Sequence, residues 1–514
     1  MHRRFHNFLN PDGSPGAMLL NGEGKIISRE LAAGEVAVPD SVDLNGAYVL
    51  PAFVDSHCHI LPTGLDLQKL NLGHCKTPDE VLQMVSDALK GIEPGKWLQA
   101  VHYDQTKFDG AQHLTREDLD KLSDTVPISL RHVNGHASVV NSAALRAANI
   151  SESESDPAGG TYRRDSSGRL DGVLLERAHE IVTSRAPEPS LEEMVEAIVA
   201  AGKAMQSLGI THATDMMTGR WHLLKELEAY HQASERESGL RISLYMQWSA
   251  VLGPRGFRPH MIQEISCQMQ PDRCQIAGLK IFADGAIGSA TAAIYGSYST
   301  AEDQTATESG TLIYAREKLQ QMMVKAAKAG YRVAVHAIGD RAVDEVLTAF
   351  EMTPDPAIHR LEHAMMLTDE RIERIRKTGC FVTMQPEFLH RFGKAYQVQL
   401  GAERAAKLKR FRSVKAAGIP LAFNSDRPIV LGDPWIGIRT AANRPDGFDP
   451  SENLSVAEAF DCYTQRGRDA DRCGDELGSL KLYQLADFVT YDKNPLKDES
   501  ASITGVYRGG EKIC

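Results

Sequence analysis

Two histidines separated by one residue, His57 and His59, follow an apolar run that ends at Val54. Alternate side chains of a β-strand point to the same face, so on a strand both imidazoles would lie on one side. Imidazole nitrogens are common ligands of zinc and related divalent ions. The spacing therefore favours a shared metal ion, although a single His-x-His pair also occurs at ordinary surface and core positions.

Three more side chains that can bind a metal stand at the C-terminal ends of short β-rich runs: His336, His363 and Asp426. In a parallel barrel the C-terminal ends of all strands meet at one mouth, where ligands distant in sequence can converge. Unrelated structural histidines would not be expected to share this position. The recurrence therefore favours a metal centre at the mouth of a barrel over a set of structural side chains.

Histidine and carboxylate ligands suit Zn²⁺ or another divalent ion that keeps one coordination position open. A water bound there has its pKa lowered from about 15.7 to about 7, which makes hydroxide available at neutral pH. Asp426 can accept the proton of that water and later pass it to a leaving nitrogen, acting first as general base and then as general acid. The residues thus predict a hydrolase with Asp426 as a catalytic residue.

Size and charge narrow the class of protein. A chain of 514 residues with 42% hydrophobic content can bury a large core, and its length suits one large α/β domain with a smaller accessory domain. The charge balance is 57 basic against 68 acidic residues, and the basic residues are scattered. This pattern argues against nucleic acid as a partner. The eight dispersed cysteines favour reduced thiols over a disulfide framework.

Targeting signals are not apparent in the sequence. The first residues lack the apolar core of a signal peptide, and no run of about 18 apolar residues occurs. We therefore expect a cytoplasmic enzyme that has no membrane contact and acts on a small-molecule substrate. The oligomeric state stays open, with a homodimer as one candidate.

The texture of the chain changes twice along its length. Short β-like pieces with glycine turns occur near both ends, which predicts a composite β-sandwich domain built from residues 1–50 and 475–514. Residues 51–474 alternate strand-like and helix-like segments, the pattern of a (β/α)8 TIM-like barrel. Residues 151–175 and 389–410 are expected to be insertions, the second helical and placed where it could form a lid.

Barrel strands are expected at residues 49–56, 128–133, 210–215, 278–283, 331–338, 360–364, 380–385 and 419–424. An additional β-like run at 241–247 gives one strand too many. The assignment in the first half of the barrel is therefore open.

The segments at residues 51–59, 279–289, 336–344, 360–364 and 424–428 together resemble the metal-dependent amidohydrolase superfamily. More narrowly, they resemble its branch of proteins similar to N-substituted formamide deformylase. Further matches at 127–145 and 478–492 extend the resemblance over nearly the whole chain.

The resemblance implies a role for each matching residue. His57 and His59 would bind the more buried metal, His336 and His363 a second metal, and Asp426 would activate water. Lys280 would carry a carbamate that bridges two divalent ions, expected to be Zn²⁺. An unmodified ammonium would repel a cation, so a ligand lysine must be carboxylated or the site must hold a single metal. The alternative is that Lys280 simply pairs with Asp284 or another carboxylate. His136 would hydrogen-bond the substrate or a developing oxyanion, with a structural role as the alternative.

The preferred interpretation is a metal-dependent hydrolase that cleaves a carbon–nitrogen bond of an amide, N-acyl amine or N-formyl amine, other than a peptide bond. One alternative is an aminohydrolase that removes an amino group from a ring. A second is a non-catalytic scaffold protein on the same fold, although every metal-binding position is filled. Specificity depends on loops whose shapes the sequence does not define, so the substrate stays open.

Overall fold

The computed structural model describes residues 2–29, 40–133, 135, 137–157, 160–236, 239–299, 309–471 and 478–514. The chain divides into two compact units. The first consists of Met1–Gly64 together with Met194–Cys514, and the second of Leu65–Glu193.

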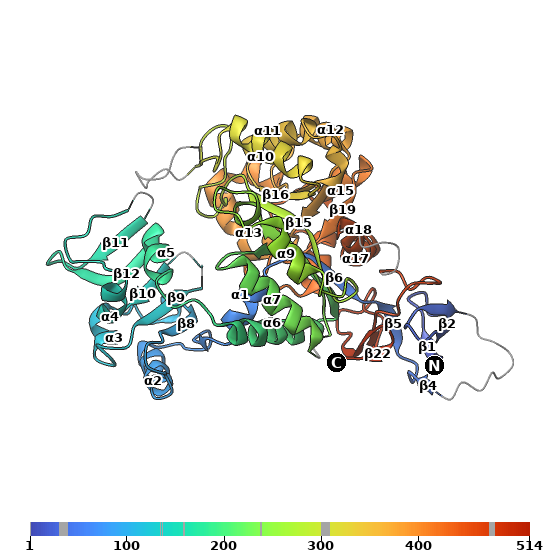
Figure 1. Ribbon diagram of the computed structural model, residues 1–514, viewed down its shortest axis with the longest axis horizontal. Coiled ribbons are helices and arrows are strands. Elements are labelled where there is room, and N and C mark those ends of the chain that lie inside the picture. Colours follow the sequence, from blue (N-terminus) through green and yellow to red (C-terminus); the bar gives the residue numbers. More distant parts are fainter. Residues whose placement is uncertain are drawn as a thin grey trace. The chain divides into compact units, whose positions relative to one another are not determined.

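A parallel barrel of eight strands forms the centre of the first unit (Figure 1). Each barrel strand pairs in parallel with the barrel strand that follows it in the sequence. The strands are β6 (Phe53–Cys58), β13 (Ile210–Thr218), β14 (Arg241–Gln247), β15 (Cys274–Phe282), β16 (Val333–Ala337), β17 (Arg360–His363), β18 (Phe381–Met384) and β19 (Leu421–Phe423).

The last strand lies beside the first, so the barrel is nearly closed. Ser56 Oγ donates a hydrogen bond to the main-chain oxygen of Phe423 at 3.1 Å. The main-chain N–H of Asp426 donates to the main-chain oxygen of His57 at 2.8 Å. The expected α/β barrel is therefore present, and its C-terminal strand ends share one rim.

Helices separate the strands in the second half of the barrel as expected. They are α10 (Arg316–Lys328), α11 (Asp340–Glu351), α12 (Asp369–Thr378) and α15 (Phe411–Ala416), which precede β16, β17, β18 and β19 in turn. The other helices that lie wholly or partly in this unit are α1 (Ile60–Leu67), α6 (Leu191–Gln206), α7 (Leu223–Glu235), α8 (Trp248–Val251), α9 (Pro259–Ser266), α13 (Glu387–Leu400), α14 (Ala402–Ala406), α16 (Pro434–Ala442), α17 (Val456–Cys462) and α18 (Gln465–Asp471). Among the described residues, no helix combines the length and apolar character needed to cross a membrane.

Local sequence explains where these helices begin and which face they bury. α11 buries Val343, Val346, Leu347 and Phe350, whose spacing places them on one side of a helix. α12 begins after Thr368, whose side chain accepts a hydrogen bond from a main-chain N–H of the first turn. It ends at a glycine with left-handed backbone geometry, which glycine adopts without steric cost.

The first half of the barrel differs from the expectation in two strands. The run at 128–133 was expected to be a barrel strand, but Ile128–His132 is β9 in a sheet of the second unit. The surplus run at 241–247 is instead β14, a barrel strand. Both runs are apolar, because each is buried in the core of its own sheet, so their composition does not distinguish them.

Both ends of the chain meet in one mixed sheet. Its strands are β1 (Arg3–Leu9), β2 (Pro15–Leu20), β3 (Ile26–Ser28), β4 (Asp40–Asp43), β5 (Tyr48–Pro51), β20 (Phe488–Tyr491), β21 (Ile503–Arg508) and β22 (Glu511–Lys512). The N-terminal strand β5 pairs antiparallel with the C-terminal strand β20. Phe488 stacks on Tyr507 with ring centroids 4.4 Å apart, and Phe5 packs edge-on against Phe488. This aromatic core ties the two ends together.

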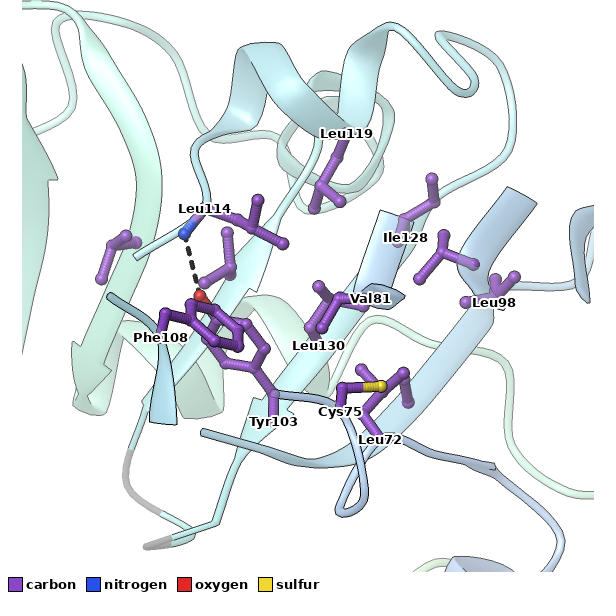
Figure 2. Packing of buried hydrophobic residues seen from close by; sticks show 14 residues of the cluster. Leu72, Cys75, Val81, Leu98, Tyr103, Phe108, Leu114, Leu119, Ile128 and Leu130 are labelled. Atoms are coloured by element: carbon purple, nitrogen blue, oxygen red, sulfur yellow. Dashed lines mark hydrogen bonds between the residues drawn. The ribbon is translucent and has the colours of Figure 1, made fainter. Parts of the chain in front are cut away.

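The second unit has its own sheet and its own apolar core. The sheet contains β7 (Leu70–Asn71), β8 (Leu98–Tyr103), β9 (Ile128–His132), β10 (Ala137–Val140), β11 (Gly160–Arg164) and β12 (Leu170–Glu176). Its helices are α2 (Pro78–Leu89), α3 (Arg116–Asp120), α4 (Ser142–Ala147) and α5 (Arg177–Thr183). Figure 2 shows the core, in which the Tyr103 hydroxyl accepts a hydrogen bond from the main-chain N–H of Leu114 at 2.8 Å.

The two expected insertions have different outcomes in the fold. Residues 151–175 were expected to be an exposed insertion, but β11 and β12 pair there as part of the second unit. The interruption of the barrel therefore extends over the whole of Leu65–Glu193. The segment at 389–410, after β18, is helical and contains most of α13 and all of α14.

Candidate metal centre

The barrel places the predicted metal-binding side chains at its C-terminal rim. His57 lies near the end of β6, with His59 directly beyond that strand, and His363 is the last residue of β17. His336 lies near the end of β16, and Asp426 follows β19. All five are almost fully removed from solvent, since the most exposed side chain, that of His336, retains 12% of its accessible surface.

His57, His59 and Asp426 form the tightest group, in which one ligand atom from each lies within 4.8 Å of the others. Oδ1 of Asp426 lies 2.9 Å from Nε2 of His59 and 3.4 Å from Nε2 of His57. Oδ2 of the same carboxylate lies 4.0 Å from Nδ1 of His363. One carboxylate therefore adjoins three imidazoles.

The two later histidines adjoin this group. The ring centroid of His363 lies 5.0 Å from that of His57 and 4.3 Å from that of His336. The structure thus brings four histidines and one aspartate, spread over 370 positions of the sequence, into a single buried cluster.

Hydrogen bonds fix which ring nitrogen of each histidine is free. Nδ1 of His57 lies 2.6 Å from Oε2 of Glu362, and Nε2 of His336 lies 3.0 Å from the main-chain oxygen of Gly285. A carboxylate and a carbonyl only accept, so these ring nitrogens must carry the proton. His57 therefore presents a bare Nε2 and His336 a bare Nδ1, the form in which imidazole binds a metal.

His363 is oriented by an amide. Its Nδ1 lies 3.0 Å from Oε1 of Gln385, a fully buried residue just after β18. An N–H on Nδ1 leaves Nε2 of His363 as the bare nitrogen. Sequence reasoning assigned no role to Gln385 or Glu362, because a hydrogen-bond partner chosen by strand packing has no spacing signal of its own.

The electrostatic environment keeps these imidazoles neutral. Burial, reinforced by the charge of Lys280, lowers the pKa of His57 well below its usual range and that of His336 to about 4. Burial together with the neighbouring His336 and His57 also lowers the pKa of His363. Neutral imidazole is the state required of a metal ligand.

Lys280 lies inside the barrel on β15 and is 1% exposed. Its Nζ lies 3.4 Å from Nε2 of His57 and 4.8 Å from the ring centroid of Phe282. Burial lowers the pKa of Lys280 to about 8. The alternative partner Asp284 is engaged elsewhere, since it accepts hydrogen bonds from the main-chain N–H groups of three other residues, Ala293, Ile338 and Gly339.

The donor set fits a divalent metal. The cluster offers bare ring nitrogens of His57, His336 and His363 and the carboxylate of Asp426. Nδ1 of His59 is also buried, and it has no hydrogen-bond partner among the described residues. Nitrogen and oxygen donors of this kind match the preferences of zinc and similar ions.

Two residues of the cluster have unusual backbone geometry. His363 has φ of 71° and Asp426 has φ of 56°, in the left-handed region that residues with a side chain rarely adopt. Such strain concentrates at functional sites, where the surrounding fold enforces it. The remaining predicted site residue, His136, lies outside the described residues.

Known proteins are similar to this chain over most of its length. A family model described as "Amidohydrolase family" matches residues 40–512. The chain is 30% identical to a protein named "Putative amidohydrolase YtcJ" from Bacillus subtilis (strain 168), covering 90% of this chain and 87% of that protein. It is 26% identical to an N-substituted formamide deformylase from Arthrobacter pascens, covering 93% and 90% respectively.

The fold is also similar to solved structures. A crystal structure described as an uncharacterized metal-dependent hydrolase from Pyrococcus furiosus superposes with a TM-score of 0.77 at 26% identity. The match covers 96% of this chain and 100% of that chain.

Proposed function

Because this chain belongs to the amidohydrolase family, whose solved relatives include metal-dependent hydrolases, we propose that it hydrolyses an amide, N-acyl or N-formyl bond of a small molecule. The observation that carries the proposal is that Asp426 adjoins His57, His59 and His363 at the barrel rim, with His336 packed against His363. The similarity to a formamide deformylase supports an acylated amine as the substrate class.

In this proposal, His57, His59, His336, His363 and Asp426 hold one or two divalent ions, with Zn²⁺ as the expected metal. Lys280, once carboxylated, would bridge two ions through its carbamate oxygens. A bound divalent ion supplies Lewis acidity, which lowers the pKa of water and polarises a carbonyl group. Two observations support this arrangement: the histidines, such as His336, are neutral, and the pKa of Lys280 is lowered.

Asp426 is the proposed proton carrier. Burial alone would raise its pKa, but the hydrogen bond with His59 and the nearby charge of Lys280 lower it below the usual value. The carboxylate is therefore charged at neutral pH and can accept a proton at Oδ1 or Oδ2 from the attacking water. Once protonated, it can donate that proton to the departing amine nitrogen, which is a poor leaving group without it.

His136 is retained as a proposed hydrogen-bond donor to the substrate carbonyl oxygen during attack. Removing one such donor commonly costs about two to three orders of magnitude in turnover. Exchanging His136 for alanine should therefore lower kcat while leaving bound metal unchanged.

The test is a screen of the metal-loaded protein against N-formyl amines, N-acyl amines, cyclic amides and aminated rings, with products identified by mass spectrometry. Release of a carboxylic acid and an amine, lost in Asp426→Asn, supports the proposal. Ammonia released from an aminated ring, with no amide cleaved, would assign the chain to the deaminase class instead.

A further inference from the structure

A fully buried lysine lies beside the metal cluster without any assigned role. Lys409 stands between α14 and α15, has φ of 53° and is 0% exposed. Its main-chain N–H donates to the oxygen of Met365 at 2.9 Å, and its own main-chain oxygen accepts from Phe411 and from the Arg444 guanidinium. The backbone therefore holds this side chain in a defined direction.

The Lys409 ammonium has one hydrogen-bond partner among the described residues, Oε1 of Gln385 at 3.0 Å. It also lies 5.2 Å from the ring centroid of Phe388. Among the described residues, no carboxylate oxygen lies within 4.0 Å of Nζ of Lys409. A buried cation without a carboxylate partner destabilises a fold. Burial accordingly lowers the pKa of Lys409 well below its usual range.

The partner of Lys409 is the amide that orients His363. Oε1 of Gln385 accepts from both Lys409 and Nδ1 of His363, each at 3.0 Å. Its Nε2 donates to Oδ1 of Asn424 at 2.8 Å, and Nδ2 of Asn424 has no hydrogen-bond partner among the described residues.

The side-chain amides of Gln385 and Asn424 can both flip and still form a hydrogen bond with each other. If both amides flipped, Nδ2 of Asn424 would donate to Oε1 of Gln385, and Nε2 of Gln385 would donate to Nδ1 of His363. His363 would then carry its proton on Nε2 and could not bind a metal through that atom. In its protonated form Lys409 opposes the flip, because an ammonium has no lone pair to accept from the amide N–H that would then face it.

The other two oriented histidines need no such restraint. His57 faces a carboxylate, Glu362, whose two oxygens both accept, and His336 faces a main-chain carbonyl. Gln385 is the orienting partner that offers a donor and an acceptor at the same site.

We propose that Lys409 is a positioning residue that locks the Gln385 amide and thereby keeps Nε2 of His363 free for a metal. This inference rests on the proposed metal centre. Lys409 acts through Gln385 and does not itself bind the metal or the substrate.

The first test is Lys409→Met, which keeps the length of the side chain and removes its donor. Zinc affinity, measured by competition with a chromogenic chelator, should fall about ten- to a hundredfold, as for other groups that orient metal ligands. The Tm of the metal-free protein should stay the same or rise, because an unpaired buried cation is lost. Lys407→Met is the matched control, since that exposed lysine pairs with Glu403 and should leave zinc affinity unchanged.

A rescue variant separates positioning from general support of the fold. Gln385→Glu places an acceptor on both branches of the side chain, so Lys409→Met/Gln385→Glu should recover most of the lost affinity. Absorption spectra of the Co²⁺-loaded proteins should change in Lys409→Met and return toward the parent spectrum in the double variant.

Unchanged zinc affinity in Lys409→Met, or no recovery in the double variant, would overturn the inference. An unfolded Lys409→Met protein would overturn it too, because a lysine essential for folding needs no positioning role to explain its burial. A parent protein that binds no divalent metal would instead remove the proposed function itself.

Discussion

Oε2 of Glu362 lies 2.6 Å from Nδ1 of His57, while the other nitrogen of that ring lies 3.4 Å from the Asp426 carboxylate. Glu362 is itself held by the fully buried guanidinium of Arg360, at 2.7 Å between Oε1 and Nε. The orientation of His57 is thus determined by a charged pair inside the barrel. Burial alone would raise the pKa of Glu362, but the charge of Arg360 outweighs that effect and keeps the pKa below its usual value.

Glu362→Gln should weaken metal binding about ten- to a hundredfold. The amide can present an N–H to Nδ1 of His57, which would move the imidazole proton onto the nitrogen that should bind the metal. Arg360 would also lose one of its two buried carboxylate partners, Glu362 and Asp471, so the Tm should fall. Metal titration and thermal unfolding check both effects. Parent-like affinity in a well-folded variant would separate Glu362 from the metal centre.

Lys280→Ala should abolish activity and reduce the amount of bound metal. Burial lowers the pKa of Lys280 to about 8, so a useful fraction of the amine is neutral near physiological pH and can add CO₂. Short carboxylic acids should partly restore turnover by replacing the carbamate oxygens.

Carbon-13 NMR of protein exchanged with labelled bicarbonate gives a direct check on Lys280. A carbamate resonance that is missing in Lys280→Ala is the expected result. An active protein with two bound metals and no such resonance would rule out the modification.

Asp426→Asn should lower kcat by about two to four orders of magnitude, the range of general acid–base catalysis. The variant keeps the shape of the side chain and one oxygen donor, so most of the metal should stay bound. Steady-state kinetics and elemental analysis measure the two quantities independently. Turnover within a few-fold of the parent would assign the proton transfer to another group.

Acid should destabilise the metal-free protein through histidines that are buried in the neutral state. Burial and the neighbouring Arg468 lower the pKa of His212 to about 4. Between the unfolded value of about 6.5 and the folded value, the unfolded chain binds more protons. The stabilisation from His212 is therefore complete above pH 6.5 and is lost as the pH falls toward 4.

The contribution of His212 amounts to about 3 kcal/mol at most. Its side chain lies 3.1 Å from the Ser243 hydroxyl and takes no part in the metal cluster. His212→Gln should consequently flatten the dependence of Tm on pH between 4 and 6.5 without affecting metal binding. An equally steep dependence in that variant would place the acid sensitivity elsewhere.

The sequence predicts the second half of the barrel more accurately than the first. From β16 to β19, each strand is followed or preceded by a helix with clear end signals, such as Thr368 and Gly379 around α12. In the first half, the buried strand β9 has the composition of a barrel strand but pairs within the second unit. Which partner an apolar strand chooses depends on tertiary packing, which local patterning does not encode.

The candidate site divides in a similar way. Histidines and the aspartate at strand ends carry a spacing signal, because a parallel barrel gathers those ends at one rim. Glu362, Gln385 and Lys409 carry none, since their roles arise from contacts between different strands and loops. Glu362 directly precedes His363 in the sequence yet bonds His57, 305 positions away.

The second unit, Leu65–Glu193, is inserted between the strand that carries His57 and the strand that follows it in the barrel. All six side chains proposed to hold the metal lie outside this stretch. Recombination in nature could therefore replace or remodel the inserted unit as a cassette while the inherited ligands stay intact.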